Sequence, residues 1–280
     1  MRNSSVSLYG NLILDKILYL DEFPCEGVAQ NILDQKVSLG GIFNIARFLL
    51  AEGDTRVSIH SSVGDDLSGD VVRKILVDST CSKVILESSS DATSTAVILN
   101  NSRFSERTGL VYWGACCNMK NFIDDMSEWK HFSYGDSLNN LHSGILEGMS
   151  GVKSLDLNRF SHSSQQRART LECIKQVDFL IASAEECLSI SESEDLIEAC
   201  KKLGKLCNRY AIIHHPEGSL ISDGVLFSEV KSGVGKLNNL DVLGAGDIFV
   251  GAFIKNYSDA LSIGEIVLRS HRDTFNSLVE

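Results

Sequence analysis

Residues 241–247 read Asp-Val-Leu-Gly-Ala-Gly-Asp and lead directly into an apolar run, Ile-Phe-Val-Gly-Ala-Phe-Ile, at residues 248–254. Glycines permit a tight backbone turn, and the apolar run predicts a helix that begins at that turn. The unpaired N–H groups of a helix start, together with the positive end of the helix dipole, favour a bound phosphate. We therefore expect an anion site at Gly244, Ala245 and Gly246.

Asp247 follows this turn and has two interpretations. A carboxylate in the first turn of a helix is stabilised by the dipole, which would be a structural role. A carboxylate beside a bound phosphoryl group can instead accept the proton of an attacking hydroxyl. Both roles are compatible with the local sequence.

The composition bounds the class of protein. A chain of 280 residues with 43% hydrophobic and 22% charged residues is ordinary for one globular α/β domain. The formal net charge of -11 disfavours a nucleic-acid partner and suits a small polar ligand. The sequence shows neither a membrane span nor a signal peptide, so we expect a cytoplasmic protein without a membrane partner. Its eight cysteines form no CxxC pair, which favours reduced, buried thiols.

Strand-like and helix-like segments alternate along the chain. Val6–Leu14 predicts a first strand, interrupted at Gly10 and Asn11, and residues 42–51 predict a helix that ends at Gly53. Further strands are expected at Val57–His60, His131–Tyr134, Val152–Asp156, Val177–Ala182 and Tyr210–His214, and helices at Asp70–Val77, Leu138–Met149, Ser164–Lys175 and Asp195–Cys207. A final hairpin should turn at Asp223 and Gly224. This alternation predicts a parallel sheet covered by helices.

Two segments fall outside the alternation. Thr95–Leu99 and Gly109–Trp113 have no helix between them and predict an antiparallel hairpin. The turn at Leu20–Gly27 leads into a mixed segment that predicts a short flap up to Ser38. We expect segments of about 12–38 and 92–116 to form a small sheet over a cleft, within a single domain of residues 1–280. A lid of this kind excludes water from phosphoryl transfer.

A second glycine motif lies near the start of the chain. Gly40 and Gly41 precede the helix of residues 42–51, and Asn44 lies in its first turn. The glycines permit close approach of a ligand to the backbone, and the Asn44 amide offers a donor and an acceptor. Asn44 could equally face solvent. Asp15, expected at the end of the first strand, could face the same pocket or be a turn residue.

The two glycine motifs together resemble the ribokinase-like, or PfkB-type, carbohydrate kinases, from Gly10 to about Phe253. The N-terminal motif comprises Asp15, Pro24, Gly40, Gly41, Asn44 and Ala46, followed by Val63–Asp66 and Gly69. The C-terminal motif comprises Gly244–Asp247 with Gly251 and Ala252. Segments between them that resemble the family are Glu106–Thr108, Gly114–Ala115, and Asp156 with Asn158.

The resemblance implies a fold, a reaction and a set of site residues. The fold would be a three-layer α/β structure with a mostly parallel sheet and a small β-sheet lid. The reaction would be ATP-dependent, Mg²⁺-assisted phosphorylation of a hydroxymethyl group on a sugar or nucleoside. Asp247 would be the general base, and Gly244, Ala245 and Gly246 would form the anion hole. The acceptor would be held by Asp15, Gly40, Gly41 and Asn44. The nucleotide would be held by Ser183, Glu186, Gly218 and Asp241, with Glu186 meeting magnesium through water and no direct protein ligand to the metal.

The sequence departs from the family pattern mainly on the nucleotide side. The Asn-x-x-Glu motif of the family is Ser183–Glu186 here, and its Thr-x-Gly-x-x-Gly strand end is Ile213–Gly218. Val242 replaces a threonine, and Asn44 lies one residue closer to the glycine pair than is usual. These substitutions leave a second function open, a catalytically weak or inactive binding or regulatory protein with this fold.

His214 and His215 lie within the altered strand end. Protonated imidazoles could contact phosphate in place of the missing threonine. The sequence favours the simpler interpretation, that both are partly exposed turn residues.

The substrate and assembly are expectations of the same kind. The basic candidates near the acceptor motif are only Lys16, Arg47, Arg103 and Arg107, which favours an unphosphorylated sugar or nucleoside. A homodimer through the lid is expected because family members often pair there. A nicotinamide-dependent oxidoreductase is disfavoured, because no G-x-G-x-x-G follows the first strand.

Overall fold

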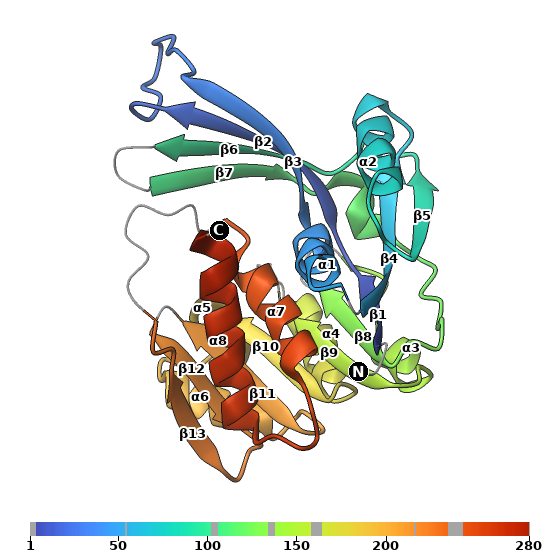
Figure 1. The fold of residues 1–280 in the computed structure, drawn as a ribbon, viewed down its shortest axis with the longest axis vertical. Coiled ribbons are helices and arrows are strands. Elements are labelled where there is room, and N and C mark those ends of the chain that lie inside the picture. Colours follow the sequence, from blue (N-terminus) through green and yellow to red (C-terminus); the bar gives the residue numbers. More distant parts are fainter. Residues whose placement is uncertain are drawn as a thin grey trace.

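The computed structural model describes residues 4–53, 55–101, 106–133, 138–157, 164–215, 217–234 and 243–279. Two β-sheets and their helices make up this part of the chain (Figure 1). None of its helices is long and apolar enough to cross a bilayer.

The larger sheet contains nine strands within the described residues, in the order β13-β12-β11-β10-β9-β8-β1-β4-β5. Their bounds are β1 Ser4–Tyr9, β4 Thr55–Gly64, β5 Lys83–Ser89, β8 Trp129–Ser133, β9 Val152–Asp156, β10 Phe179–Ser183, β11 Tyr210–His215, β12 Gly218–Ser222 and β13 Phe227–Lys231. Seven neighbouring strands of this sheet are parallel, namely β11, β10, β9, β8, β1, β4 and β5. Strands β12 and β13 add an antiparallel edge. The carboxyl ends of the parallel strands therefore meet at one edge, where ligands bind in open α/β sheets.

Helices cover both faces of this sheet. One face packs against α1 (Ile42–Ala51), α2 (Leu67–Val77), α7 (Ala245–Asn256) and α8 (Ile263–Val279). The other packs against α3 (Ser143–Glu147), α4 (Ser164–Ile174), α5 (Ala184–Ser191) and α6 (Leu196–Gly204). Successive strand residues point to opposite faces, so Ile181 joins the first core and Leu180 the second. A strand buried on both faces reads as a continuous apolar run.

The smaller sheet has the order β3-β2-β6-β7, with bounds β2 Leu12–Leu20, β3 Asp34–Gly41, β6 Thr95–Asn101 and β7 Glu106–Tyr112. It extends from the main body above α1 and the C-terminal end of α8 (Figure 1). Its inner face has its own apolar cluster of Ile13, Ile17, Ala96 and Ile98. A 3₁₀ turn at Gly114–Asn118 returns the chain to the main sheet.

The predicted fold class is confirmed, and several element boundaries differ from those expected. The first predicted strand is two strands, because Gly10 and Asn11 break the chain between β1 and β2, so that Asp15 lies inside β2 and not at a strand end. The helix expected at Leu138–Met149 is only Ser143–Glu147. The elements that were not predicted include β5, α5 and the long α8, which occupies the C-terminal region.

Candidate active site

The turn before α7 presents bare backbone to the carboxyl edge of the main sheet. Gly244 is the N-cap of α7 and adopts a left-handed conformation, φ 78° and ψ 8°. Its carbonyl oxygen accepts the first helical hydrogen bond, from Ile248 N–H at 2.9 Å. The amides of Ala245, Gly246 and Asp247 precede that bond and have no acceptor within the helix. The predicted anion site thus lies at a helix N-terminus.

Asp247 lies in the first turn of α7, half-buried, and is held by α1. Asn44 Nδ2 donates a hydrogen bond to Asp247 Oδ2 at 2.8 Å. Burial raises the pKa of Asp247 to about 7, the negative charges of Asp156, Asp15 and Glu186 act in the same direction, and the Asn44 hydrogen bond opposes them. Asp247 forms no ion pair with the residues that the structure describes. Its environment therefore resembles that of a general base poised near neutral pH.

Asp15 lies on the inner face of the small sheet. It is 8% exposed, and burial raises its pKa to about 7. It pairs across the ladder with Ser38, two residues before Gly40. A Cβ at Gly40 would collide with the Asp15 carboxylate, so glycine at 40 makes room for this acid.

The second glycine of the pair starts α1. Gly41 is both the last residue of β3 and the N-cap of α1, with φ 65°. The Ile42 N–H donates to the Asn11 carbonyl oxygen at 3.0 Å, which fixes the junction against the β1–β2 connection. A left-handed residue with no room for Cβ must be glycine. Asn44 is thereby placed one turn into the helix, toward Asp247.

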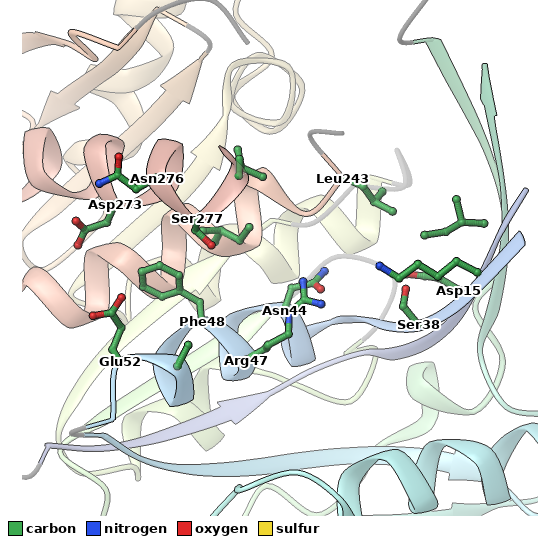
Figure 2. A pocket seen from close by; sticks show the side chains of 15 residues that line it. Asp15, Ser38, Asn44, Arg47, Phe48, Glu52, Leu243, Asp273, Asn276 and Ser277 are labelled. Atoms are coloured by element: carbon green, nitrogen blue, oxygen red, sulfur yellow. The ribbon is translucent and has the colours of Figure 1, made fainter. Parts of the chain in front are cut away.

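A cavity of about 490 Å³ lies between the small sheet, α1 and the C-terminal part of α8. Asp15 and Ser38 line it from the small sheet, and Asn44 and Arg47 from α1 (Figure 2). Its remaining lining residues are Ile17, Lys36, Phe48, Ala51, Glu52, Leu243, Ile248, Asp273, Asn276, Ser277 and Leu278. Asp247 is not among them but is hydrogen-bonded to one of them, Asn44. The structure thus brings Asp15 and Asn44 to one cavity, with the predicted anion site beside it.

The sequence analysis did not identify Lys36, Ser38 or the α8 residues of this cavity. Ser38 could have been inferred from alternation with Gly40, because residues two apart on a strand share a face. The α8 residues of the cavity were missed because the helix itself was not predicted.

The predicted nucleotide residues lie at the ends of β10 and β12. Ser183 caps α5, accepting a hydrogen bond from Glu186 N–H at 3.3 Å, while Glu186 Oε2 accepts one from Ser183 N–H at 2.8 Å. Gly218 begins β12, where a Cβ would collide with the backbone of β13, which is a packing reason for glycine. Asp241 lies outside the described residues.

Magnesium has no preformed cage in the described part of the chain, where no group of three or more His, Cys, Asp or Glu side chains is arranged to hold a metal. Glu186, the residue expected to meet magnesium through water, caps α5.

His214 and His215 are the last residues of β11 and not turn residues, although both are half-buried, as expected. The His214 ring lies 5.3 Å from the ring of Phe249, measured between centroids. Its Cε1 is 3.6 Å from the position of a Cβ built on Gly246. Burial lowers the pKa of His214, and Glu186 and Asp156 oppose that change. A neutral imidazole therefore flanks the predicted anion site.

Asp156, at the end of β9, is already engaged. Its Oδ1 accepts a hydrogen bond from Ser133 Oγ at 3.1 Å, and its Oδ2 lies 3.1 Å from His131 Nε2. Its charge acts on the site at a distance, as one cause of the raised pKa of Asp247. Asn158, its partner in the family resemblance, is outside the described residues.

Comparison with known proteins identifies the class. The sequence profile of the pfkB family of carbohydrate kinases matches residues 3–272, so the chain belongs to that family. No curated protein sequence matches it.

Solved structures share the fold at low sequence identity. Ribokinase from Thermotoga maritima superimposes with a TM-score of 0.79 at 19% identity, covering 99% of this chain and 93% of the ribokinase. Adenosine kinase from Sinorhizobium meliloti gives 0.77 at 20% identity, covering 100% and 95%. Arabidopsis thaliana ribokinase, solved with ribose and ATP, gives 0.79 at 16% identity, covering 100% and 94%. The fold is therefore that of the ribokinase-like kinases.

Proposed function

We propose that this protein is an ATP-dependent kinase that phosphorylates a hydroxymethyl group of a sugar or nucleoside. The observation that carries the proposal is the placement of Asp247, half-buried at the N-terminus of α7 and oriented by Asn44. Membership of the pfkB family and the fold shared with ribokinases support it.

Asp247 is the general base of the proposed reaction. Its carboxylate takes the proton of the acceptor hydroxyl as the hydroxyl oxygen attacks the phosphoryl group. Asn44, on α1, is the positioning residue that holds the Asp247 carboxylate toward the acceptor. A base of raised pKa is strong enough to accept this proton and is still deprotonated in part at neutral pH.

The amides of Ala245 and Gly246 stabilise the transferred group, with Gly244 providing the turn. Preorganised N–H donors at a helix start reduce the energy of charge that develops on phosphoryl oxygens. Bound Mg²⁺ would neutralise further negative charge on the nucleotide phosphates, with Glu186 meeting it through water. Ser183 and Gly218 border the proposed nucleotide side.

Asp15, Gly40, Gly41 and Asn44 hold the acceptor in this proposal. Asp15 faces the cavity and can bind acceptor hydroxyls, and Gly40 leaves space for it. The small sheet is the lid, because its inner face closes one side of the cavity and its exclusion of water would prevent hydrolysis of ATP.

A coupled ADP-release screen over sugars, sugar phosphates and nucleosides tests the proposal. Wild type should release ADP with at least one acceptor, and Asp247→Asn should lose about 100-fold or more of kcat. The matched control is Asp70→Asn, which removes an exposed carboxylate on α2 and should keep full activity. Turnover unchanged in Asp247→Asn would refute the assigned base.

Calorimetry with ATP and magnesium provides a readout that does not depend on turnover. Wild type and Asp247→Asn should both bind the nucleotide, because the amides of the α7 turn remain. Absence of binding at millimolar concentration would contradict the kinase assignment and indicate a binding or regulatory protein. That outcome would be explained by the substitutions at Ser183, Ile213 and His215.

A further inference from the structure

The cavity carries an unequal set of charges. Three acids line it, Asp15, Glu52 and Asp273, and two bases, Lys36 and Arg47. Two of the acids share one basic neighbour, because Lys255 Nζ lies 2.6 Å from Glu52 Oε2 and 3.1 Å from Asp273 Oδ2, so that a single negative charge is left on these three groups. Burial raises the pKa of the third acid, Asp15, to about 7, so that its negative charge is incomplete at neutral pH.

The two bases have no such neighbour in the part of the chain that the structure describes. Among the residues that the structure describes, neither Lys36 nor Arg47 forms an ion pair or a side-chain hydrogen bond. Both are exposed at the cavity. Two cations that face one cavity without a partner among the described residues stand out in a protein of net charge -11, where surface acids are abundant.

Their positions relative to the proposed base are set by two regular elements. On β3, Lys36 shares the inner face with Ser38 and lies opposite Ile17, while Ser38 lies opposite Asp15. Lys36 is thus about 7 Å farther along the sheet than the row of Asp15. On α1, Arg47 follows Asn44 by three residues, about 4.5 Å along the helix. Figure 2 shows the Asp15 and Ser38 side and the α1 side facing each other across the cavity.

We propose that Lys36 and Arg47 form a subsite for an anionic substituent of the acceptor, a phosphate or a carboxylate, at the end away from the hydroxyl that reacts. This inference rests on the proposed kinase function. The guanidinium and ammonium groups bind the anion from α1 and from the small sheet, while Asp15 and Asn44 bind the hydroxyls between. The sequence analysis favoured an unphosphorylated acceptor because Lys36 was not recognised beside Arg47.

The subsite also connects the small sheet to the helix. An anion held by Lys36 on β3 and by Arg47 on α1 joins the two sides of the cavity through the ligand. Neutral acceptors lack this connection, so the charge would contribute to specificity as well as to affinity.

Matched pairs of acceptors test the subsite. D-fructose 6-phosphate is compared with D-fructose, and D-gluconate with D-glucitol, because each retains a free hydroxymethyl group and each pair differs in charge. We expect kcat/KM for at least one anionic acceptor to exceed that of its neutral counterpart by about tenfold or more. The phosphate and carboxylate arms distinguish the two sources of the anion.

The variants are Lys36→Gln and Arg47→Gln, each measured with both members of a pair. The ratio of anionic to neutral kcat/KM should fall about tenfold in each variant, chiefly through KM. Lys16→Gln is the matched control, because Lys16 lies on the same sheet but on the opposite face from Asp15, and its ratio should equal that of wild type. Circular dichroism checks that each variant is folded.

Calorimetric binding of the same four acceptors separates this inference from the kinase assignment. Turnover with neutral acceptors only, and no stronger binding of the anionic ones, contradicts the subsite and leaves the kinase intact. A protein that releases no ADP but binds an anionic acceptor in a Lys36- and Arg47-dependent manner retains the subsite and refutes the kinase. Equal ratios in Lys36→Gln, Arg47→Gln and Lys16→Gln would also overturn the subsite.

Discussion

The Asp247 side chain is held where its own charge is disfavoured. Burial is the largest cause, and three further carboxylates, Asp156, Asp15 and Glu186, add to it. Asn44 offsets part of this cost with one hydrogen bond. Proteins commonly accept such local instability at catalytic groups, because a carboxylate with an ordinary pKa is a weak base at neutral pH.

The pH dependence of catalysis follows from this raised pKa. The proposed base acts when deprotonated, so kcat/KM for ADP release should rise with pH through an apparent pKa of about 7. A profile measured between about pH 5.5 and 9 checks this expectation. A flat profile over that range would show that no group of this pKa controls the reaction.

The free energy of unfolding should fall as pH rises, whereas kcat/KM should increase. Asp247 has a pKa of about 7 in the folded state against an ordinary aspartate value of 3.8, so between these values the folded state binds more protons than the unfolded state. The free energy of unfolding therefore falls as pH rises through this window. Asp247→Asn removes the charge and should stabilise the protein by about 1–2 kcal/mol at pH 8, a figure reduced from the full shift because the side chain is half-buried. Thermal unfolding at pH 8 and pH 5 tests this, since the gain should be much smaller at pH 5.

At the scale of elements, α1 and α7 pack side by side in a fixed register. Asn44 meets Asp247, Phe48 packs against Gly251, and Glu52 pairs with Lys255. Each contact follows the previous one by four residues on both helices, so a single face of each helix is used. The register couples the acceptor motif on α1 to the anion site on α7 through packing as well as through one hydrogen bond.

Gly244→Ala should disturb this arrangement at its start. A Cβ at 244 would lie 2.9 Å from Asn44 Nδ2, and the left-handed backbone would add about 1 kcal/mol of strain. We expect kcat to fall by about tenfold or more, because Asn44 can no longer orient Asp247. Gly53→Ala is the matched control, with φ 82° and no atom within 4 Å of its Cβ. Gly53→Ala introduces similar backbone strain without a steric clash. Equal loss of activity in Gly53→Ala and Gly244→Ala would therefore contradict the explanation by a clash with Asn44.

Local sequence signals predicted the elements near the glycine motifs well. Residues 42–51 form α1 and Val152–Asp156 form β9, as predicted. The broad apolar face of the helix and the short apolar run of the strand identify these two elements from local sequence. Helix α5 was not predicted, although Ser183 and Glu186 form a capping box at its N-terminus. The helix expected at 138–149 is short, and Gly144 and Gly148 both weaken it.

The site was predictable only where its residues belong to one motif. Asp247, Asn44 and the glycines could be identified from their motifs, yet the hydrogen bond between Asn44 and Asp247 depends on how α1 packs against α7. Lys36 reaches the cavity because β3 pairs with β2 in one register, with Asp15 opposite Ser38. If the β2–β3 pairing shifted by one residue, Lys36 and Ser38 would point to the other face of the sheet. The register depends on pairing between distant segments, so the local sequence does not predict it.

On the scale of the whole molecule, the small sheet has an apolar outer face. Val37 and Leu110 are 54% and 62% exposed, and they lie in one row across the sheet with Lys16 and Val97. Exposed apolar side chains on a four-stranded sheet with open edges are typical of an interaction surface. This face is the candidate surface for the expected homodimer.

We expect a concentration-dependent dimer by size-exclusion chromatography with light scattering. Leu110→Glu should shift the protein to a monomer, because it places a charge on the apolar face at its β7 edge. Leu67→Glu, at an 84% exposed position on α2, is the control and should leave the dimer intact. A monomeric wild type at every concentration would exclude this surface as a stable interface.

The direct passage from β3 into α1 has a mechanical meaning. Gly41 is the last residue of the strand and the N-cap of the helix, and its neighbour Ile42 is tied to Asn11. Because no linker separates β3 from α1, a movement of the small sheet would also rotate α1 and shift Asn44. Closure of the small sheet over the acceptor and orientation of the Asp247 carboxylate toward it would then occur in one movement.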